Sequence, residues 1–113
     1  MTMAEKRYDK LIRDRIPEII RVSGRQCVCR VMEQQEYLER LDQKLPEELN
    51  EYLESGSLEE LADLTEVIHA VVRARGYTLT QLEQARADKA RDRGGFEKRL
   101  LLEAVLDLEE MLE

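Results

Sequence analysis

Carboxylate side chains are concentrated in residues 46–63, PEELNEYLESGSLEELAD, where seven of eighteen positions are acidic. The pattern Glu-Glu-Leu-x-acid occurs twice in this stretch, at 47–51 and at 59–63. Oxygen ligands without Cys or His among them suit Mg²⁺ and Mn²⁺, ions that retain waters and bridge to phosphates. The repeated pattern therefore makes this stretch a candidate site for such a cation.

The positions of these acids around their helices bear on whether they form a built site or a solvated surface, and geometry alone leaves the two interpretations about equal. Because successive helical residues turn by about 100°, Glu60 falls inside the apolar stripe of its expected helix, and Asp63 lies at the border of that stripe. In the preceding helix, Glu48 borders the apolar face, whereas Glu51 and Glu47 step away from it. A carboxylate that faces a core is costly unless it is paired or binds a metal. Glu60 is therefore expected to be the acid turned most strongly toward the core.

The two acidic patterns flank the sequence SGS at 55–57, which is typical of one helix ending and another beginning. A turn this short makes the two helices antiparallel neighbours. Glu51 and Glu60 are about equally far from the turn, as are Glu48 and Asp63, so the four carboxylates are expected in two nearly level pairs. The alternative is that Glu60 completes a helix cap and the other acids are surface residues.

The chain is predicted to be mainly α-helical, because Leu, Glu, Arg and Ala are abundant while there are only five Gly and two Pro. Helices are expected at about 14–23 with Asp14 as N-cap, at 33–43, at 46–54 after a kink or new start at Pro46, at 58–75 and at 80–93. The alternating segment 26–32 is expected to be a strand or extended, and residues 96–113 either pair with it or form a helix.

A single domain over residues 1–113 is expected, with an acidic tail from about residue 105. Residues 31–66 contain twelve acidic and two basic residues, whereas 1–30 and 67–99 each contain eight basic and four acidic residues. This arrangement suits a metal bound to a polyphosphate, and it equally suits segments that attract one another. The net charge of −7 disfavours general binding to nucleic-acid polymers.

A cytoplasmic protein is expected from the lack of a recognisable targeting signal in this sequence and from its cysteine pattern. No apolar run approaches the ~20 residues that cross a bilayer, and the polar N-terminus lacks a signal-peptide core. Cys27 and Cys29 are expected to be reduced structural thiols, because the C-x-C spacing with no other Cys does not make a metal pair.

Three motifs, in order, resemble one known superfamily. Glu47-Glu48-Leu49-Asn50-Glu51 and Glu60-Leu61-Ala62-Asp63 are similar to the EExxE and ExxD motifs of the all-α nucleoside triphosphate pyrophosphohydrolases, which include the MazG and phosphoribosyl-ATP pyrophosphohydrolase families. Residues 10–18, KLIRDRIPE, and 89–96, KARDRGGF, resemble the KLVRDKIPE-like and K-x3-RGGF motifs of the compact phosphoribosyl-ATP pyrophosphohydrolase-like proteins. The likeness spans residues 8 to about 102.

The resemblance implies an antiparallel helical hairpin in a bundle completed by association, as a homodimer or homotetramer. It implies Mg²⁺-dependent hydrolysis, with Mn²⁺ as the alternative ion, of a nucleoside triphosphate to the monophosphate and pyrophosphate, as in house-cleaning of non-standard nucleotides. The metal ligands would be Glu48, Glu51, Glu60 and Asp63. Glu47 would orient or deprotonate the attacking water, and the phosphates would meet Lys10, Arg13, Arg15, Lys89 and Arg93.

Two other functions remain open on the sequence. One is a regulatory module that binds metal and nucleotide without catalysis. The other is a helical interaction protein whose acidic hairpin binds a basic partner and no metal.

Overall fold

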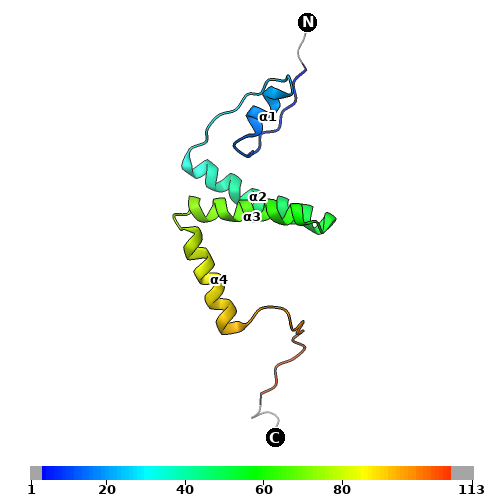
Figure 1. The fold of residues 1–113 in the computed structure, drawn as a ribbon, viewed down its shortest axis with the longest axis vertical. Helices are drawn as coiled ribbons and strands as arrows, with labels where there is room; N and C mark the ends of the chain where they lie inside the picture. Colours follow the sequence, from blue (N-terminus) through cyan, green and yellow to red (C-terminus); the bar gives the residue numbers. More distant parts are fainter. Residues whose placement is uncertain (1–3, 108–113) are drawn as a thin grey trace. The chain divides into compact units, whose positions relative to one another are not determined.

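The computed structural model describes residues 4–107, and the chain divides into two compact units, 1–79 and 80–113. The first unit contains α1 (Ile16–Val22), α2 (Gln34–Ser55) and α3 (Leu58–Ala74), and α4 (Leu79–Arg93) supplies the helix of the second (Figure 1). Residues 4–107 contain four α-helices and no β-strand, so the mainly α fold class is confirmed. The single domain stays a prediction. None of these helices is both long enough and apolar enough to span a membrane.

Helices α2 and α3 pack side by side as an antiparallel hairpin (Figure 1). Leu41 of α2 and Val67 of α3 are its most buried apolar residues, at 2% and 7% exposure. At the end of the hairpin away from the turn, the start of α2 is hydrogen-bonded to the end of α3, because the Gln34 side-chain amide donates to the Ala74 carbonyl oxygen at 3.0 Å. This hairpin is the rigid frame of the first unit.

The turn between α2 and α3 uses the residues that the sequence predicts. Gly56 ends α2 with φ of 63°, a left-handed conformation that side chains disfavour, and its N–H donates to the Tyr52 carbonyl oxygen at 2.7 Å. Ser57 then caps α3, because its hydroxyl accepts from the Glu60 N–H at 3.3 Å. The predicted helix end and start are confirmed.

The predicted helix start at Pro46 is wrong, because α2 continues unbroken from Gln34 to Ser55. A proline inside a helix leaves one carbonyl without its donor and costs about 3 kcal/mol. Here the same partner helix packs against both halves of α2, and Leu41 before the proline and Glu48 after it are both buried. Tertiary packing therefore outweighs the local penalty, and Glu47 lies within a continuous helix.

Helix α1 forms where it was predicted, but Asp14 is not its N-cap. Pro17 occupies the first turn, a favoured place for proline, so the cap position falls on Arg15, which makes no side-chain cap hydrogen bond. Helix α4 also forms as predicted and gives way at Gly94, where φ is 85°.

Of the two expectations for residues 26–32, the strand is not formed, and the segment has no regular secondary structure. Neither of the alternatives for the C-terminal segment is observed up to residue 107. Val28 and Val31 are almost fully exposed, and Leu100 is 85% exposed. A strand needs a partner for its backbone groups, and neither segment has a β-partner within residues 4–107. The acidic tail beyond residue 107 lies outside the described residues.

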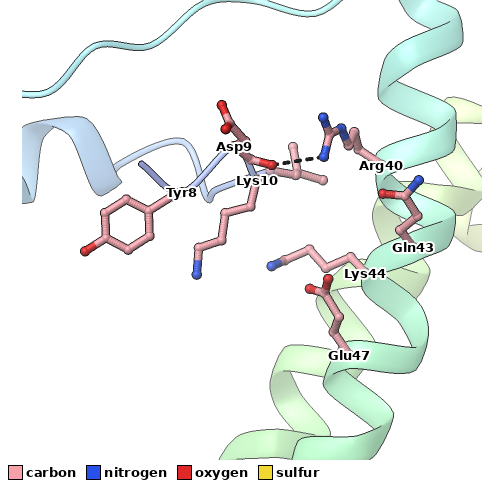
Figure 2. A pocket seen from close by; sticks show the side chains of 8 residues that line it. Tyr8, Asp9, Lys10, Arg40, Gln43, Lys44 and Glu47 are labelled. Atoms are coloured by element: carbon pink, nitrogen blue, oxygen red, sulfur yellow. Dashed lines mark hydrogen bonds between the residues drawn. The ribbon is translucent and has the colours of Figure 1, made fainter. Parts of the chain in front are cut away.

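The N-terminal segment 8–11 lies against α2 (Figure 2). Arg40 of α2 donates from Nη1 to the backbone carbonyl oxygen of Asp9 at 2.9 Å. Further along, Arg13 donates from Nη2 to Asp63 Oδ1 of α3 at 2.6 Å. The N-terminal segment from Asp9 to Arg13 is thus hydrogen-bonded to both helices of the hairpin.

Candidate metal centre

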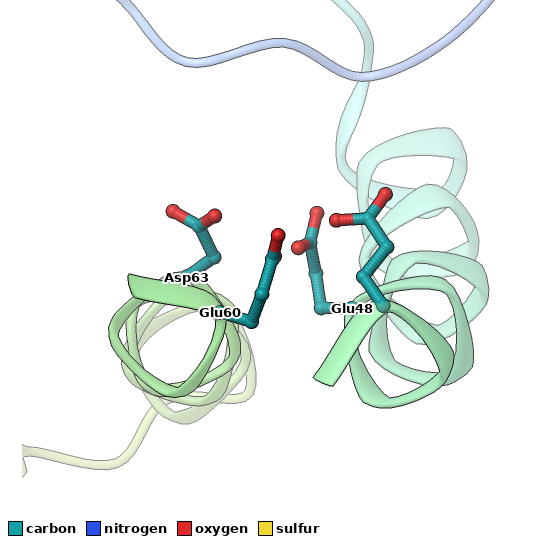
Figure 3. A group of neighbouring side chains, drawn as sticks. Glu48, Glu60 and Asp63 are labelled. Atoms are coloured by element: carbon teal, nitrogen blue, oxygen red, sulfur yellow. The ribbon is translucent and has the colours of Figure 1, made fainter. Parts of the chain in front are cut away.

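Four carboxylates from the two packed helices gather in one place. Glu48 and Glu51 come from α2, Glu60 and Asp63 come from α3, and each offers an oxygen within 4.8 Å of the others. Residues three apart share a helix face, so each helix presents its pair toward the same space. Figure 3 shows Glu48, Glu60 and Asp63 extending to one side of the facing helices.

Burial distinguishes this cluster from a solvated acidic surface. Glu48 is only 8% exposed, and Glu60 and Asp63 are half-buried. One oxygen each of Glu48 and Glu60, Oε2 in both, is buried and has no hydrogen-bond partner within the described part of the chain. Such an orphaned group costs about 1–3 kcal/mol, and more when it is charged. An all-oxygen donor set with unpartnered buried oxygens fits a hard divalent cation such as Mg²⁺ or Mn²⁺.

Two cationic side chains pair directly with the cluster. Lys44 Nζ lies 3.5 Å from Glu48 Oε1, and its side chain is only 19% exposed. Arg13 holds Asp63 Oδ1 at 2.6 Å in a more exposed pair. Four ionised carboxylates and these two cations leave a net charge of −2. A divalent cation would neutralise that charge.

The electrostatics of Glu48 reflect the same excess of negative charge. Burial raises the pKa of Glu48, the Glu51 carboxylate raises it further, and Asp63 adds a smaller upward effect. The ammonium group of Lys44 opposes these effects and lowers the pKa. A proton and a metal ion would therefore compete for the same carboxylate.

The structure changes the ranking of the acids. Helical spacing turns Glu60 most strongly toward the core, yet Glu48 is the more deeply buried of the two. Glu66, three residues after Asp63, is exposed and lies outside the cluster. Glu47 is exposed and is not one of the four clustered acids; it lines a neighbouring pocket instead. Its role as the base stays a prediction.

The five basic residues with predicted phosphate contacts are placed differently. Arg13 touches the cluster, and Lys10 lines the same pocket as Glu47. Arg15 is paired with Glu18 at 3.2 Å on the surface of α1. Lys89 and Arg93 are exposed on α4 in the second compact unit, and their phosphate contacts stay predictions.

Sequence reasoning missed Lys44, the only mostly buried cation paired with the cluster among residues 4–107. A signal was present, because Lys44 and Glu48 are four residues apart, the spacing at which helical side chains meet. Arg40 was also missed. Its hydrogen bond goes to the backbone of Asp9, 31 residues away, and no local sequence pattern predicts such a contact.

Comparisons with known proteins were made against family models, curated proteins and solved structures. No family model matches the chain, and no solved structure matches it. An uncharacterised protein of Mycolicibacterium smegmatis is 55% identical over 42 residues, which cover 37% of this chain and 43% of that protein. The match thus spans less than half of either sequence, and the resemblance to the pyrophosphohydrolases stays a prediction.

Proposed function

We propose that the protein is a nucleoside triphosphate pyrophosphohydrolase of the MazG-like and phosphoribosyl-ATP pyrophosphohydrolase-like type, dependent on Mg²⁺ or Mn²⁺. The reaction would convert a nucleoside triphosphate to the monophosphate and pyrophosphate, removing non-standard nucleotides from the pool. The observation that carries the proposal is the four-carboxylate cluster with two buried, unpartnered oxygens. The ordered motifs at 10–18, 47–63 and 89–96 support the choice of substrate class.

The residues of the chain divide the work between metal and phosphate. Glu48, Glu51, Glu60 and Asp63 would hold the cation. A bound divalent cation supplies charge neutralisation for the polyphosphate and acidifies water. Arg13 lies at the edge of the cluster, where its guanidinium could exchange Asp63 for a phosphate oxygen. Exposed Glu47 would accept the proton of the water that displaces pyrophosphate.

The hairpin supports association into a homodimer or homotetramer. Its large apolar side chains remain exposed in the single chain, among them Leu49, Leu53, Leu58, Leu61 and Ile68 at 37% exposure or more. Burial of apolar surface is favourable by roughly 25 cal/mol per Å², so covering these residues with a second copy would complete the thin core. Sedimentation at several protein concentrations would measure the assembly, and a monomer at all of them would contradict it.

A nucleotide panel tests the activity. Standard, oxidised and deaminated triphosphates and phosphoribosyl-ATP would be incubated with the protein and Mg²⁺, and release of pyrophosphate and monophosphate would be measured. Turnover should require the metal and be lost in Glu60→Gln. Glu59→Gln is the matched control, because Glu59 is the adjacent exposed acid outside the cluster. Absence of turnover with every nucleotide, or equal activity of both variants, would overturn the proposal.

Calorimetric titration with nucleotide and thermal unfolding with added metal separate the two competing functions. Metal-dependent nucleotide binding without product would indicate a non-catalytic regulatory module. A melting temperature unchanged by Mg²⁺ and Mn²⁺ would indicate an acidic interaction surface that binds no metal.

A further inference from the structure

A pocket of about 230 Å³ lies between segment 8–11 and α2 (Figure 2). One of its lining residues, Lys44, pairs with Glu48 of the carboxylate cluster. The charged lining of the pocket consists of Lys10, Arg40 and Lys44 with Asp9 and Glu47. The carboxylate of Asp9 points away from the space between the two lysines. Pockets that enclose a complete small molecule measure roughly 300–1,000 Å³. This smaller, mainly cationic pocket suits one or two phosphoryl groups of a larger ligand.

The two lysines of the pocket point into the same space from opposite walls (Figure 2). Lys10 comes from the N-terminal segment, and no ion pair to it is present within residues 4–107; its ammonium lies 5.8 Å from the ring centre of Tyr8. Lys44 comes from α2 and pairs with Glu48 alone in that part of the chain. Two ammonium groups directed at one space repel each other unless an anion lies between them.

Lys44 connects the pocket to the carboxylate cluster. Its distance of 3.5 Å to Glu48 Oε1 is longer than the ~2.7–2.9 Å of a strong charge-assisted hydrogen bond. An ammonium group has three donors, so Lys44 can bond to a phosphoryl oxygen while it remains beside Glu48. A phosphoryl group in the pocket and one near the cluster could then be consecutive groups of the same phosphate chain.

Arg40 positions the wall that carries Lys10. Its guanidinium donates to the Asp9 carbonyl oxygen at 2.9 Å, and Asp9 has φ of 46°, a left-handed conformation that costs a non-glycine residue roughly 1–2 kcal/mol. The hydrogen bond holds this strained residue in place, immediately before Lys10. Arg40 thus acts through the backbone rather than through the anion.

We propose that this pocket is the subsite for the terminal phosphoryl groups of the substrate, with Lys10 and Lys44 as its phosphate ligands and Arg40 as the residue that positions Lys10. The assignment rests on the proposed function, because the phosphate chain is that of a metal-bound nucleoside triphosphate. It adds Lys44 and Arg40 to the basic residues that the sequence motifs single out.

Calorimetric titration of the full chain with Mg²⁺ present tests the subsite with two probes, inorganic pyrophosphate and a nucleoside triphosphate with a non-hydrolysable α,β-methylene bond. Lys10→Gln and Lys44→Gln should each weaken the binding of both probes about 10-fold or more. Lys6→Gln is the matched control, since the Lys6 ammonium also lies near the Tyr8 ring, 5.0 Å from its centre, but Lys6 does not line the pocket. It should change both affinities less than twofold.

Further measurements separate phosphate binding from metal binding and from folding. Lys44→Gln should leave the affinity for Mg²⁺ alone unchanged or higher, because a cation beside Glu48 is removed. Arg40→Gln should weaken probe binding, and Arg40→Lys should restore most of it. Wild-type affinity for either probe in both lysine variants would overturn the subsite even if nucleotides are hydrolysed. Lysine-dependent binding without any turnover would overturn the proposed activity and leave the subsite standing.

Discussion

The carboxylate cluster and the neighbouring cationic pocket share α2, but their second walls differ in kind. The second wall of the cluster is α3, which packs along α2 and is joined to it by a tight turn. The second wall of the pocket is the irregular segment 8–11, held to α2 by the hydrogen bond from Arg40 to Asp9. Groups on packed helices are positioned more precisely than groups on loops. The clustered acids are therefore carried by two packed helices, whereas Lys10 is carried by an irregular segment.

This difference matches the demands of the two proposed ligands, a divalent cation and a phosphate chain. Mg²⁺ requires near-ideal octahedral geometry, and a helix pair can supply fixed oxygens. A phosphate chain tolerates a range of distances from flexible lysines, since an ammonium group acts as a point charge with three rotatable donors. Lys44 belongs to both regions, because it pairs with Glu48 of the cluster and lines the pocket.

The largest effect is expected from Glu48→Gln, which removes the most buried charge of the cluster. Even outer-shell changes at metal sites cost about 10–100-fold in affinity or activity, so kcat/KM with Mg²⁺ should fall about 100-fold or more. The increase in melting temperature on adding Mg²⁺ should also disappear. Glu54→Gln, in an exposed acid of the same helix, should retain both properties. Turnover by Glu48→Gln within a few-fold of wild type would contradict the role of Glu48 as a metal ligand.

Leu41→Ala should damage both regions, because Leu41 is the most buried apolar residue of the helix that they share. Replacing a buried Leu by Ala lowers the free energy of unfolding by about 2–5 kcal/mol, with the lower end expected for so thin a core. Urea denaturation measures the loss. Leu101→Ala, at a position 83% exposed, should change stability by less than about 0.5 kcal/mol. Equal effects of the two variants would contradict the assigned core.

Ser57→Ala should act on the cluster and spare the pocket, because Ser57 caps α3 next to Glu60. Loss of a serine cap lowers the free energy of unfolding by about 1 kcal/mol. Ser57→Thr keeps a hydroxyl acceptor and should lie close to wild type. Thermal unfolding with matched pyrophosphate titrations compares the two regions, and an unchanged melting temperature in Ser57→Ala would show that the cap contributes nothing.

The smallest effect is expected from pH in the metal-free protein. The folded-state pKa of Glu48 is raised above its ordinary value of 4.5, chiefly by burial and then by Glu51. Its contribution to the free energy of unfolding is therefore fully present below pH 4.5 and is lost as the pH rises through the folded-state value. Urea denaturation in a chelator should show wild type gaining stability relative to Glu48→Gln as the pH is lowered from neutral toward 4.5. A gain in the opposite direction would contradict the raised pKa.

Local patterns predicted much of the hairpin and the membership of the cluster. Gly56 and Ser57 act through contacts with residues a few positions away, and the spacing within each acidic pair follows the helical period. The new helix start at Pro46 and the strand alternative for 26–32 came from equally local signals, and both were wrong. In those places the outcome depended on a distant partner, which α2 has in α3 and segment 26–32 lacks within residues 4–107.

The sequence by itself determined which acids share a helix face and that two such faces meet across a short turn, because both follow from helical geometry and turn chemistry. Only the tertiary structure decided that Glu48 is more deeply buried than Glu60, since burial depends on how the two helices pack. It also decided that Lys44 faces both the cluster and a pocket closed by the N-terminal segment. That segment lies more than thirty residues away along the chain, and no spacing within a helix encodes its return.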